Sequence, residues 1–462
     1  MADFARCLHF AKMKMGIFYA LKPEQVQTLQ ELWNGIDTVA ILPTGFGKSI
    51  IYQLLPYLIQ KKTGAAEPMI AIVVAPLNSI MEDQIQSLRS KNLKGCYLSY
   101  DAKEIVTFGD NEDDIEEHSS DKETEESPTT SVLGKMFDLT ELKSGRYNII
   151  YSHPEALHTK KIQKIFHSPV YQQRVCAVAI DEVHMISEWG SEFRPAFRKL
   201  GELTVIFPNA CHLALTATCT EQRKNELTDT LQYRKYTCVS INPDRPNIYL
   251  SKRSRLPNIK KIDKLDSLIE PVAVELTDKL SDFPVTIMYV ENLEALGYFY
   301  QYLNSYLGKR QYTGEEIPEN RIFAQYHKDY TKAMKSFIVS DLCKKKPTIR
   351  LVLATVALGM GLDAPSISRV IHCRPPTSLE AYMQEIGRAG RRGQSSEAIL
   401  YYNNNDISKA RKGISDSIIQ YCQDDVNCLR LLLVKHFGFS ETQYSGNPNG
   451  CCSNCKNAHL NK

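Results

Sequence analysis

Short apolar runs alternate with amphipathic stretches along the first 240 residues. Five runs predict buried strands: Val39–Leu42, Ile70–Ala75, Asn148–Ser152, Val175–Ile180 and Cys211–Leu215. Helical spacing fills the gaps between them, as in Ile50–Gln60, Met81–Leu88 and Glu221–Leu231. Strands that are buried on both faces are apolar throughout, and in α/β folds they alternate with helices. The pattern therefore predicts a doubly wound α/β fold with a parallel sheet.

The same pattern starts again near residue 285. Its predicted strands are Val285–Val290, Ile322–Gln325, Leu351–Ala354, Val370–His372 and Glu397–Tyr402, and its helices include Leu293–Tyr306 and Leu379–Glu385. Two prolines and several turn residues in 241–247 place the junction between the two patterns there. We expect three parts, namely residues 1–240, residues 241–405 and a helical part over 406–462.

Residues 104–130 interrupt the first pattern. They carry eleven acidic residues against Lys122 alone, and they are rich in Ser and Thr. So few core-forming residues predict a disordered surface insertion. A solvated spacer is the simpler interpretation, and a phosphorylation or docking segment for a protein partner is the alternative.

The net charge of +3 is unevenly distributed. The acidic segment accounts for −10, which leaves +13 for the rest of the chain and suits a polyanionic partner. No apolar run approaches the roughly 20 residues needed to span a membrane, and the first residues lack the pattern of a secretory signal. We therefore expect an intracellular protein, with reduced cysteines among its thirteen.

A glycine loop follows the first predicted strand. It reads Pro43-Thr44-Gly45-Phe46-Gly47-Lys48-Ser49, and a predicted helix comes directly after it. In this context the loop amides and the helix N-terminus face a phosphate, Lys48 reaches the β- and γ-phosphates, and Ser49 can coordinate Mg²⁺. Because Leu42 stands where the usual motif has its first glycine, a chance glycine turn is the alternative.

Two charged motifs could complete such a site. Asp181-Glu182-Val183-His184 follows a predicted strand, so that Asp181 would hold Mg²⁺ and Glu182 would orient or deprotonate the attacking water. Arg388 and Arg391 are three residues apart and could point together at a γ-phosphate. A basic surface helix that binds nucleic-acid phosphates is the alternative, and it suits Arg392 better.

These motifs, in this order, resemble those of the RecQ helicases of superfamily 2, over nearly the whole chain from about Tyr19 to Cys455. Further matching stretches are 19–25 (the adenine motif), 75–84, 215–218, Arg245-Pro246-Asn247, 288–292, 354–363 and 384–391. The resemblance implies two RecA-like P-loop domains, with ATP and Mg²⁺ as cofactors, and a small helical zinc-binding subdomain. The sequence ends at Lys462, where larger members continue into winged-helix and HRDC-type domains, so we expect a short form without them.

The resemblance also assigns roles to residues of the nucleotide site. Tyr19 and Lys22 would sandwich the adenine, whose N6/N7 edge Gln25 would read. The remaining nucleotide-binding residues would be Thr44, Gly45, Gly47, Lys48, Ser49 and Gln384, with Arg388 and Arg391 acting as arginine fingers.

The stretch 184–197 resembles the aromatic-rich loop that marks RecQ proteins. Trp189 and Phe193 can stack on DNA bases without reading their sequence, and Arg194 can add a phosphate or cation–π contact. The alternative is that Trp189 is a core residue that follows a strand.

Cysteines near the end of the chain match the zinc subdomain of that family. Cys428 lies on a predicted helix, and Cys452 and Cys455 have metal-knuckle spacing. The fourth ligand is either Cys451, which is adjacent to Cys452, or His459.

The resemblance implies an ATP-dependent 3′–5′ DNA helicase that acts on single-stranded and forked DNA. It also implies a nuclear protein of DNA repair, recombination or replication. A DNA-stimulated ATPase that translocates without strong unwinding is one alternative, and an RNA helicase is another.

Overall fold

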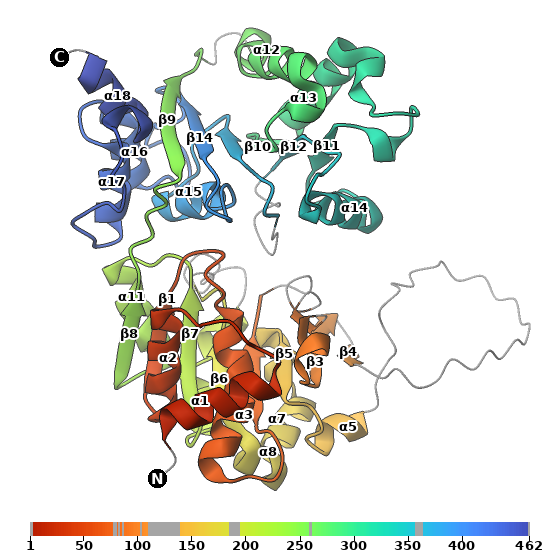
Figure 1. Ribbon diagram of the computed structural model, residues 1–462, viewed down its shortest axis with the longest axis vertical. Coiled ribbons are helices and arrows are strands. Elements are labelled where there is room, and N and C mark those ends of the chain that lie inside the picture. The colour runs from red at the N-terminus through yellow and green to blue at the C-terminus, as the bar shows by residue number, and fades with distance from the viewer. Residues whose placement is uncertain are drawn as a thin grey trace, which may run out of the picture. The chain divides into compact units, whose positions relative to one another are not determined.

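The computed structural model of the protein describes residues 3–76, 81, 84–85, 87–101, 104–109, 139–183, 195–257, 261–355 and 364–460. The chain forms two compact units, each built on one sheet (Figure 1). The first unit comprises Met1–Leu42, Phe46–Thr216 and Gln222–Ile241, and the second comprises Pro43–Gly45, Ala217–Glu221 and Asn242–Lys462.

The sheet of the first unit has the strand order β4-β3-β5-β2-β6-β7-β1-β8. All neighbouring pairs are parallel except β3 and β4. The strands are β1 (Asp37–Ile41), β2 (Ile70–Val74), β3 (Gly95–Asp101), β4 (Glu104–Gly109), β5 (Ile149–Ser152), β6 (Val175–Ile180), β7 (Cys211–Thr216) and β8 (Tyr236–Ser240).

Helices cover both faces of this sheet. The described ones are α1 (Phe4–Lys14), α2 (Pro23–Trp33), α3 (Ser49–Thr63), α5 (Leu139–Lys143), α6 (Pro154–Leu157), α7 (Lys160–Phe166), α8 (Pro169–Arg174), α10 (Glu202–Ile206) and α11 (Glu221–Leu231). Side chains of β2 alternate between two cores: Ala71 and Val73 pack with α1, α2 and α3, whereas Ile72 and Val74 pack with helices of the opposite face. Burial on both faces explains why β2 is apolar at every position.

The second sheet has the order β11-β12-β10-β13-β14-β9, and all its neighbouring strands are parallel. Its strands are β9 (Ile248–Ser254), β10 (Thr286–Tyr289), β11 (Phe323–Tyr326), β12 (Leu351–Ala354), β13 (Arg369–His372) and β14 (Ser396–Tyr402). Its helices are α12 (Lys261–Lys279), α13 (Leu293–Leu307), α14 (Lys332–Cys343), α15 (Leu379–Ile386), α16 (Asp416–Gln423), α17 (Leu429–His436) and α18 (Ser453–Leu460).

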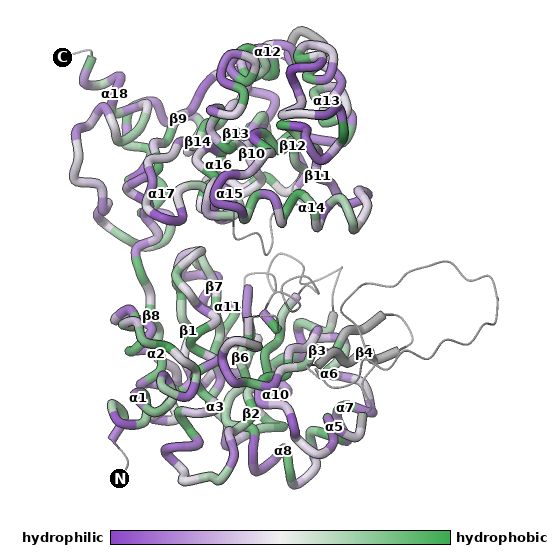
Figure 2. Tube along the Cα trace, turned by 45° about the vertical axis from the view of Figure 1, so that its right-hand side comes forward, coloured by the Kyte–Doolittle hydropathy of each residue, from purple (hydrophilic) through white to green (hydrophobic). Residues whose placement is uncertain are grey.

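Helices α12 and α13 pack on one face of the second sheet, and α14 to α17 pack on the other. The cysteine-bearing C-terminal segment shares the latter core, since Leu429, Leu433 and Cys452 cluster there with Val370 and Ala398 of the sheet. In Figure 2 the hydrophobic colour follows the central strands, while the helices carry both colours. Among the described residues, no helix has both the length and the apolar character that a membrane crossing requires.

The predicted fold class is confirmed, since two sheets, parallel except for the edge strand β4, are each covered by helices. The prediction of a disordered segment over 104–130 is wrong at its start, because Glu104–Gly109 forms β4 and pairs antiparallel with β3. Its Ile105-Val106-Thr107-Phe108 run consists of good strand formers. The acidic residues from 110 to 130 lie outside the described residues.

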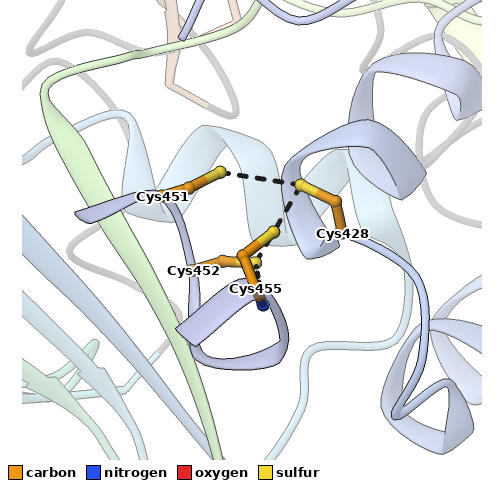
Figure 3. A group of neighbouring side chains, drawn as sticks. All are labelled: Cys428, Cys451, Cys452 and Cys455. Atoms are coloured by element: carbon orange, nitrogen blue, oxygen red, sulfur yellow. Dashed lines mark hydrogen bonds between the residues drawn. The ribbon is translucent and has the colours of Figure 1, made fainter. Parts of the chain in front are cut away.

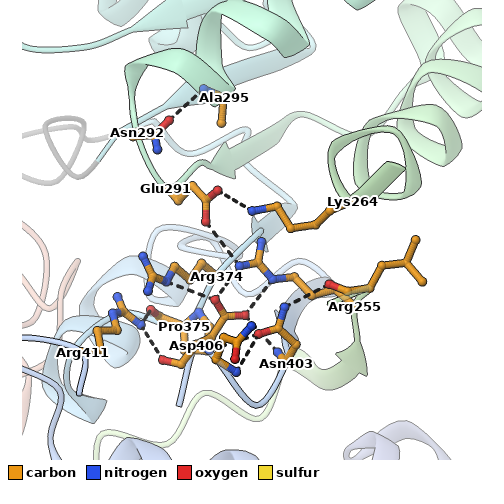
Figure 4. Close-up of polar contacts among 12 residues, drawn as sticks. Arg255, Lys264, Glu291, Asn292, Ala295, Arg374, Pro375, Asn403, Asp406 and Arg411 are labelled. Atoms are coloured by element: carbon orange, nitrogen blue, oxygen red, sulfur yellow. Dashed lines mark hydrogen bonds and ion pairs between the residues drawn. The ribbon is translucent and has the colours of Figure 1, made fainter. Parts of the chain in front are cut away.

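A buried ion-pair network joins the loops that follow four strands of the second sheet (Figure 4). Asp406 accepts a hydrogen bond from Arg255 Nε at 2.7 Å, and its other oxygen lies 3.2 Å from Arg374 Nε. Glu291 pairs with Arg255 at 3.3 Å and with Lys264 at 2.7 Å. The side chains of Arg255 and Asp406 are 1% and 0% exposed. Neither charge could therefore be compensated by water if the other were removed.

We expect Asp406→Asn to lower the free energy of unfolding by about 3–5 kcal/mol, because it leaves the buried Arg255 with Glu291 as its remaining carboxylate and takes the carboxylate from the partly exposed Arg374. Asp416→Asn is the matched control, since Asp416 is 73% exposed and forms an ion pair with Lys409, which is also exposed, and it should cost at most about 1 kcal/mol. Urea unfolding measures both variants. Equal losses would contradict a structural role for the network.

Candidate functional site

The glycine loop joins β1 to α3, as predicted. Gly45 and Gly47 have φ angles of +77° and +84°, a region that side-chain-bearing residues rarely adopt. Lys48 is the N-cap of α3, which begins at Ser49. The loop thus leads directly into a helix N-terminus, where backbone N–H groups favour an anion.

Gln25 of α2 lies against this loop and is only 4% exposed. Its Nε2 donates to the carbonyl oxygens of Phe46 and Gly47 at 3.0 and 3.1 Å, and its Oε1 accepts from the backbone N–H of Lys22 at 2.9 Å. A Cβ at Gly47 would lie 2.9 Å from Gln25 Nε2. Gln25 therefore supports the shape of the glycine loop, and its contact with adenine stays a prediction.

The other two residues of the predicted adenine motif lie nearby in the chain. The ammonium of Lys22 lies over the ring of Phe46, 3.9 Å from its centroid. Tyr19 is 60% exposed, and its carbonyl accepts a hydrogen bond from Lys12. The exposed ring of Tyr19 leaves a surface on which a base could stack, so the sandwich also stays a prediction.

The acidic motif lies at the carboxyl end of β6. Asp181 is buried, and one of its carboxylate oxygens accepts the backbone N–H of Glu182 at 2.9 Å. Glu182 has φ +50°, which is uncommon for a residue other than glycine. In this conformation its carboxylate lies 3.8 Å from the Lys48 ammonium. The structure therefore brings together the lysine and the glutamate that the sequence placed in one site.

Ser49 and Asp181 both neighbour Tyr52, a fully buried residue of α3. Burial, followed by the charges of Tyr151 and Asp181, raises the pKa of the Tyr52 hydroxyl, whereas a hydrogen bond with Ser49 opposes the rise. Hydroxyl and carboxylate oxygens are ligands that Mg²⁺ takes. The role of Ser49 and Asp181 as magnesium ligands stays a prediction, while Thr44 lies half-buried in the glycine loop.

The two predicted arginine fingers lie in the second unit, on the loop that follows α15. Arg388 is 6% exposed, Arg391 is half-buried and Arg392 is exposed. Arg392 therefore matches the surface position expected of it. Gln384, on α15, is half-buried.

A buried pair fixes α15 against the sheet. His372 Nε2 of β13 lies 2.7 Å from the Glu385 carboxylate, and the imidazole stacks on the Tyr289 ring with centroids 5.1 Å apart. Both His372 and Tyr289 are buried at the carboxyl ends of their strands. We call residues 387–393, which follow α15, the arginine loop. The contacts of His372 with Glu385 and Tyr289 fix the start of this loop to β13 and β10.

Sequence reasoning assigned no structural role to three residues near the loop that follows α15, namely Arg245, Asn247 and Arg430. Arg245 and Asn247 donate hydrogen bonds to this loop, and Arg430 donates one to the backbone of Arg245. The signal for two of them was the Arg-Pro-Asn motif, which marked only a domain start. No sequence pattern pointed to Arg430, whose partners lie far away in the chain.

Four cysteines converge as predicted (Figure 3). The Sγ atoms of Cys428, Cys451, Cys452 and Cys455 all lie within 4.8 Å of one another. Cys428 Sγ is 3.6 Å from Cys451 Sγ and 3.9 Å from Cys452 Sγ. Four sulfurs at about 2.3 Å from one tetrahedral zinc ion are about 3.8 Å apart. The spacing therefore fits a closed, structural Cys₄ site.

The geometry favours Cys451 over His459 as the fourth ligand. Cys451 is buried within the cluster, whereas His459 is exposed on α18 and does not belong to the group. Hydrogen bonds within the cluster lower the pKa of Cys452 and raise the pKa of Cys451, and burial followed by such hydrogen bonds raises the pKa of Cys455, so the thiols do not ionise independently.

The predicted DNA-binding residues Trp189, Phe193 and Arg194 lie outside the described residues, as do His184 and residues 356–363 of a further matching motif. Their roles stay predictions.

We expect Gly47→Ala to weaken the binding of an ATP analogue at least about tenfold, because the new methyl group would displace Gln25 and the loop carbonyls it holds. Gly35→Ala is the matched control: its φ is +80° but no atom lies within 4 Å of its Cβ position. It should therefore lose stability and keep nucleotide affinity. Fluorescence titration measures the affinity of each variant for the ATP analogue. Equal affinities for the two variants would contradict the prediction.

We expect one zinc ion per chain, lost in Cys451→Ser and kept in His459→Ala and in Cys343→Ser, whose cysteine is exposed. Atomic absorption on the purified proteins measures the metal, and thermal unfolding reports the stability that a structural site supplies. Metal loss in His459→Ala with retention in Cys451→Ser would show that the ligand set is different.

Two protein families match the chain, one after the other. These are "DEAD/DEAH box helicase" over residues 22–227 and "Helicase conserved C-terminal domain" over residues 261–393. Among solved structures, the helicase MrfA bound to DNA and AMPPNP has a TM-score of 0.62 at 18% identity and covers 97% of this chain and 55% of its own. The DEAD-box helicase Mss116 bound to ssRNA has a TM-score of 0.62 at 15% identity, and the match covers 96% of this chain and 81% of the Mss116 chain. At such identities the likeness shows the fold.

Curated relatives extend the similarity to almost the whole chain. The ATP-dependent DNA helicase Q-like 4B of Arabidopsis thaliana is 27% identical over 96% of this chain and 36% of its own length. The RecQ-like DNA helicase BLM of Xenopus laevis is 27% identical over 96% and 30%, and the ATP-dependent DNA helicase Q1 of Rattus norvegicus is 28% identical over 94% and 62%. The chain thus spans between about a third and two thirds of these relatives. Two helicase domains in order, together with RecQ-type relatives that match 94–96% of this chain, show that the chain belongs to the RecQ-type helicases of superfamily 2.

Proposed function

We propose that this protein is an ATP-dependent 3′–5′ DNA helicase that couples ATP hydrolysis to movement along single-stranded DNA and to unwinding of forked duplexes. One observation carries the ATPase part. The Lys48 ammonium and the Glu182 carboxylate face each other at 3.8 Å, at the ends of two strands of one sheet. The RecQ-type relatives, which are described as DNA helicases, support the choice of DNA. The polarity and the role in repair, recombination or replication follow from the family resemblance.

In this proposal Lys48 leaves Glu182 for the β- and γ-phosphates when ATP binds, which frees the carboxylate to orient the attacking water. Ser49 and Asp181 hold Mg²⁺, whose charge offsets that of the phosphate oxygens. The loop amides around Gly47 bind the phosphate chain, and Gln25 keeps that loop in shape.

The remaining residues follow from the family resemblance. Arg388 and Arg391 stabilise the charge that develops on the γ-phosphate, where such an arginine is worth about 10³–10⁵ in rate. Trp189 and Phe193 stack on single-stranded DNA and, with Arg194, report its presence to the neighbouring acidic motif.

An RNA helicase is the second candidate function. It is favoured by a relative described as a putative ATP-dependent RNA helicase of Acanthamoeba polyphaga mimivirus, which is 27% identical over 95% of this chain. The positive remainder of the chain would suit either polyanion. The two functions differ in which nucleic acid accelerates ATP hydrolysis.

We expect single-stranded DNA to stimulate ATP hydrolysis more strongly than RNA of the same sequence. Lys48→Ala should lower both basal and stimulated rates at least about 100-fold, because it removes the phosphate-binding ammonium. Lys61→Ala, which alters an exposed lysine of the same helix, is the control and should match the wild type. A phosphate-release assay measures all rates, and stronger stimulation by RNA would favour the second candidate.

In the same assay Trp189→Ala should keep its basal rate and lose stimulation by DNA, because the stacking contact is made only with the nucleic acid. Equal loss of the basal and the stimulated rate in this variant would contradict the assigned coupling role.

A further inference from the structure

Arg430 is the largest fully buried side chain among the described residues, and it lies on α17 two residues after Cys428. Its Nη1 pairs with the Asp244 carboxylate at 2.6 Å and donates to the carbonyl of Arg245 at 2.8 Å. Its Nη2 donates to the carbonyls of Ile248 and Cys451 at 2.6 and 3.3 Å. One guanidinium therefore connects the cysteine cluster to the segment 244–248.

Asp244 is itself buried and uses both carboxylate oxygens. One oxygen pairs with Arg430, and the other accepts the backbone N–H of Gln443 at 2.6 Å. The ring of Tyr444 lies 5.1 Å from the Arg430 guanidinium carbon. The segment that precedes β9 is thus fixed from two directions by residues of the C-terminal part of the chain.

The side chain of Arg245 leaves this fixed backbone toward the arginine loop. Its Nη1 donates to the carbonyl of Gly387 at 3.3 Å, and its Nη2 donates to those of Ala389 and Gly390 at 3.2 and 2.7 Å. The carbonyls of Gly387 and Ala389 flank Arg388, and that of Gly390 immediately precedes Arg391. A planar guanidinium can serve several diverging acceptors at once, which a lysine ammonium on a flexible stem does less well.

Asn247, two residues after Arg245 in the same segment, also holds the arginine loop. Its Nδ2 donates to the carbonyls of Gly390 and Gln394, both at 2.9 Å. The contact is so close that a Cβ at Gly390 would lie 2.3 Å from Asn247 Nδ2. Gly390 also has φ +66°, so both its lack of a side chain and its backbone conformation suit this position.

We propose that Arg245 and Asn247 are positioning residues for Arg388 and Arg391, and that Arg430 anchors them to the cysteine cluster. The inference rests on the proposed function, because positioning matters for hydrolysis only if the two arginines act on ATP. It assigns the C-terminal cysteine-bearing part a share in the ATPase site, through a continuous set of hydrogen bonds within one unit.

We call the hydrogen bonds of Arg245 and Asn247 to residues 387–394 the clamp. The charge near Arg245 explains why its guanidinium needs these carbonyl acceptors. Burial, followed by the positive charge of nearby Arg391, lowers the pKa of Arg245. Three backbone carbonyls accept hydrogen bonds from the Arg245 guanidinium. These bonds compensate for its position beside the positive charge of Arg391. Removing either arginine would relax this arrangement, so their substitutions should not act independently.

Steady-state ATPase kinetics test the positioning role. Arg245→Ala should lower kcat at least about tenfold and leave KM within about twofold, because the loss falls on the transition state. Arg245→Lys should not restore kcat, since it keeps the charge and loses the fork. The double variant of Arg245→Ala with Arg391→Ala should lose less than the product of the two single fold-losses in kcat, because part of the effect of Arg245 acts through Arg391. Arg310→Ala, at an exposed arginine of the same unit, is the control.

Hydrogen exchange followed by mass spectrometry tests the clamp without any need for activity. Amides of the loop are hydrogen-bonded within the same unit: Gly387 N–H donates to the carbonyl of Met383, and Gly390 N–H donates to that of Ile367. Arg245→Ala, Asn247→Ala and Arg430→Lys should each speed exchange over residues 387–393 at least about tenfold, with exchange over α12 unchanged in the folded protein.

Unchanged exchange over 387–393 in all three variants would overturn the clamp. Faster exchange together with a kcat like that of the wild type, or with additive losses in the double variant, would overturn the positioning role. A wild-type chain that hydrolyses no ATP would overturn the proposed function instead, and the exchange data would still measure the clamp.

Discussion

Parallel strands end at one edge of their sheet, and this constraint decides which charged residues meet. Lys48 follows β1 and Glu182 follows β6, with only β7 between these two strands. The left-handed backbone of Glu182 turns its carboxylate toward the lysine, 3.8 Å away. The sheet therefore pairs Lys48 with Glu182, and in the proposed function the phosphates of ATP compete with this partly exposed ion pair.

The same constraint operates in the second sheet, where the loops after β9, β10, β13 and β14 bring Arg255, Glu291, Arg374 and Asp406 together. Such a network specifies which loops adjoin, because each buried charge is costly without its partners. The arginine loop after α15 is held differently, by donors aimed at its backbone carbonyls.

Much of the fold could be predicted from the sequence, because centrally placed strands such as Val175–Ile180 are apolar at every position. Strand β9 was missed because it lies at an edge and ends in Lys252-Arg253-Ser254, and β4 was missed because acidic residues surround its apolar run. The glycine loop and the acidic motif were recognisable because their chemistry is local. The partners of Arg430 were not, since Asp244 lies 186 residues away in the chain.

Strand displacement on forked DNA tests the central claim most directly. The substrate is a duplex with a single-stranded 3′ arm and a labelled strand, incubated with the wild-type chain or with Lys48→Ala, with and without ATP. The account predicts that the labelled strand is released only by the wild type with ATP, and that a duplex with only a 5′ arm stays intact. ATP turnover without release of the strand, or release that is equal in Lys48→Ala, would contradict it.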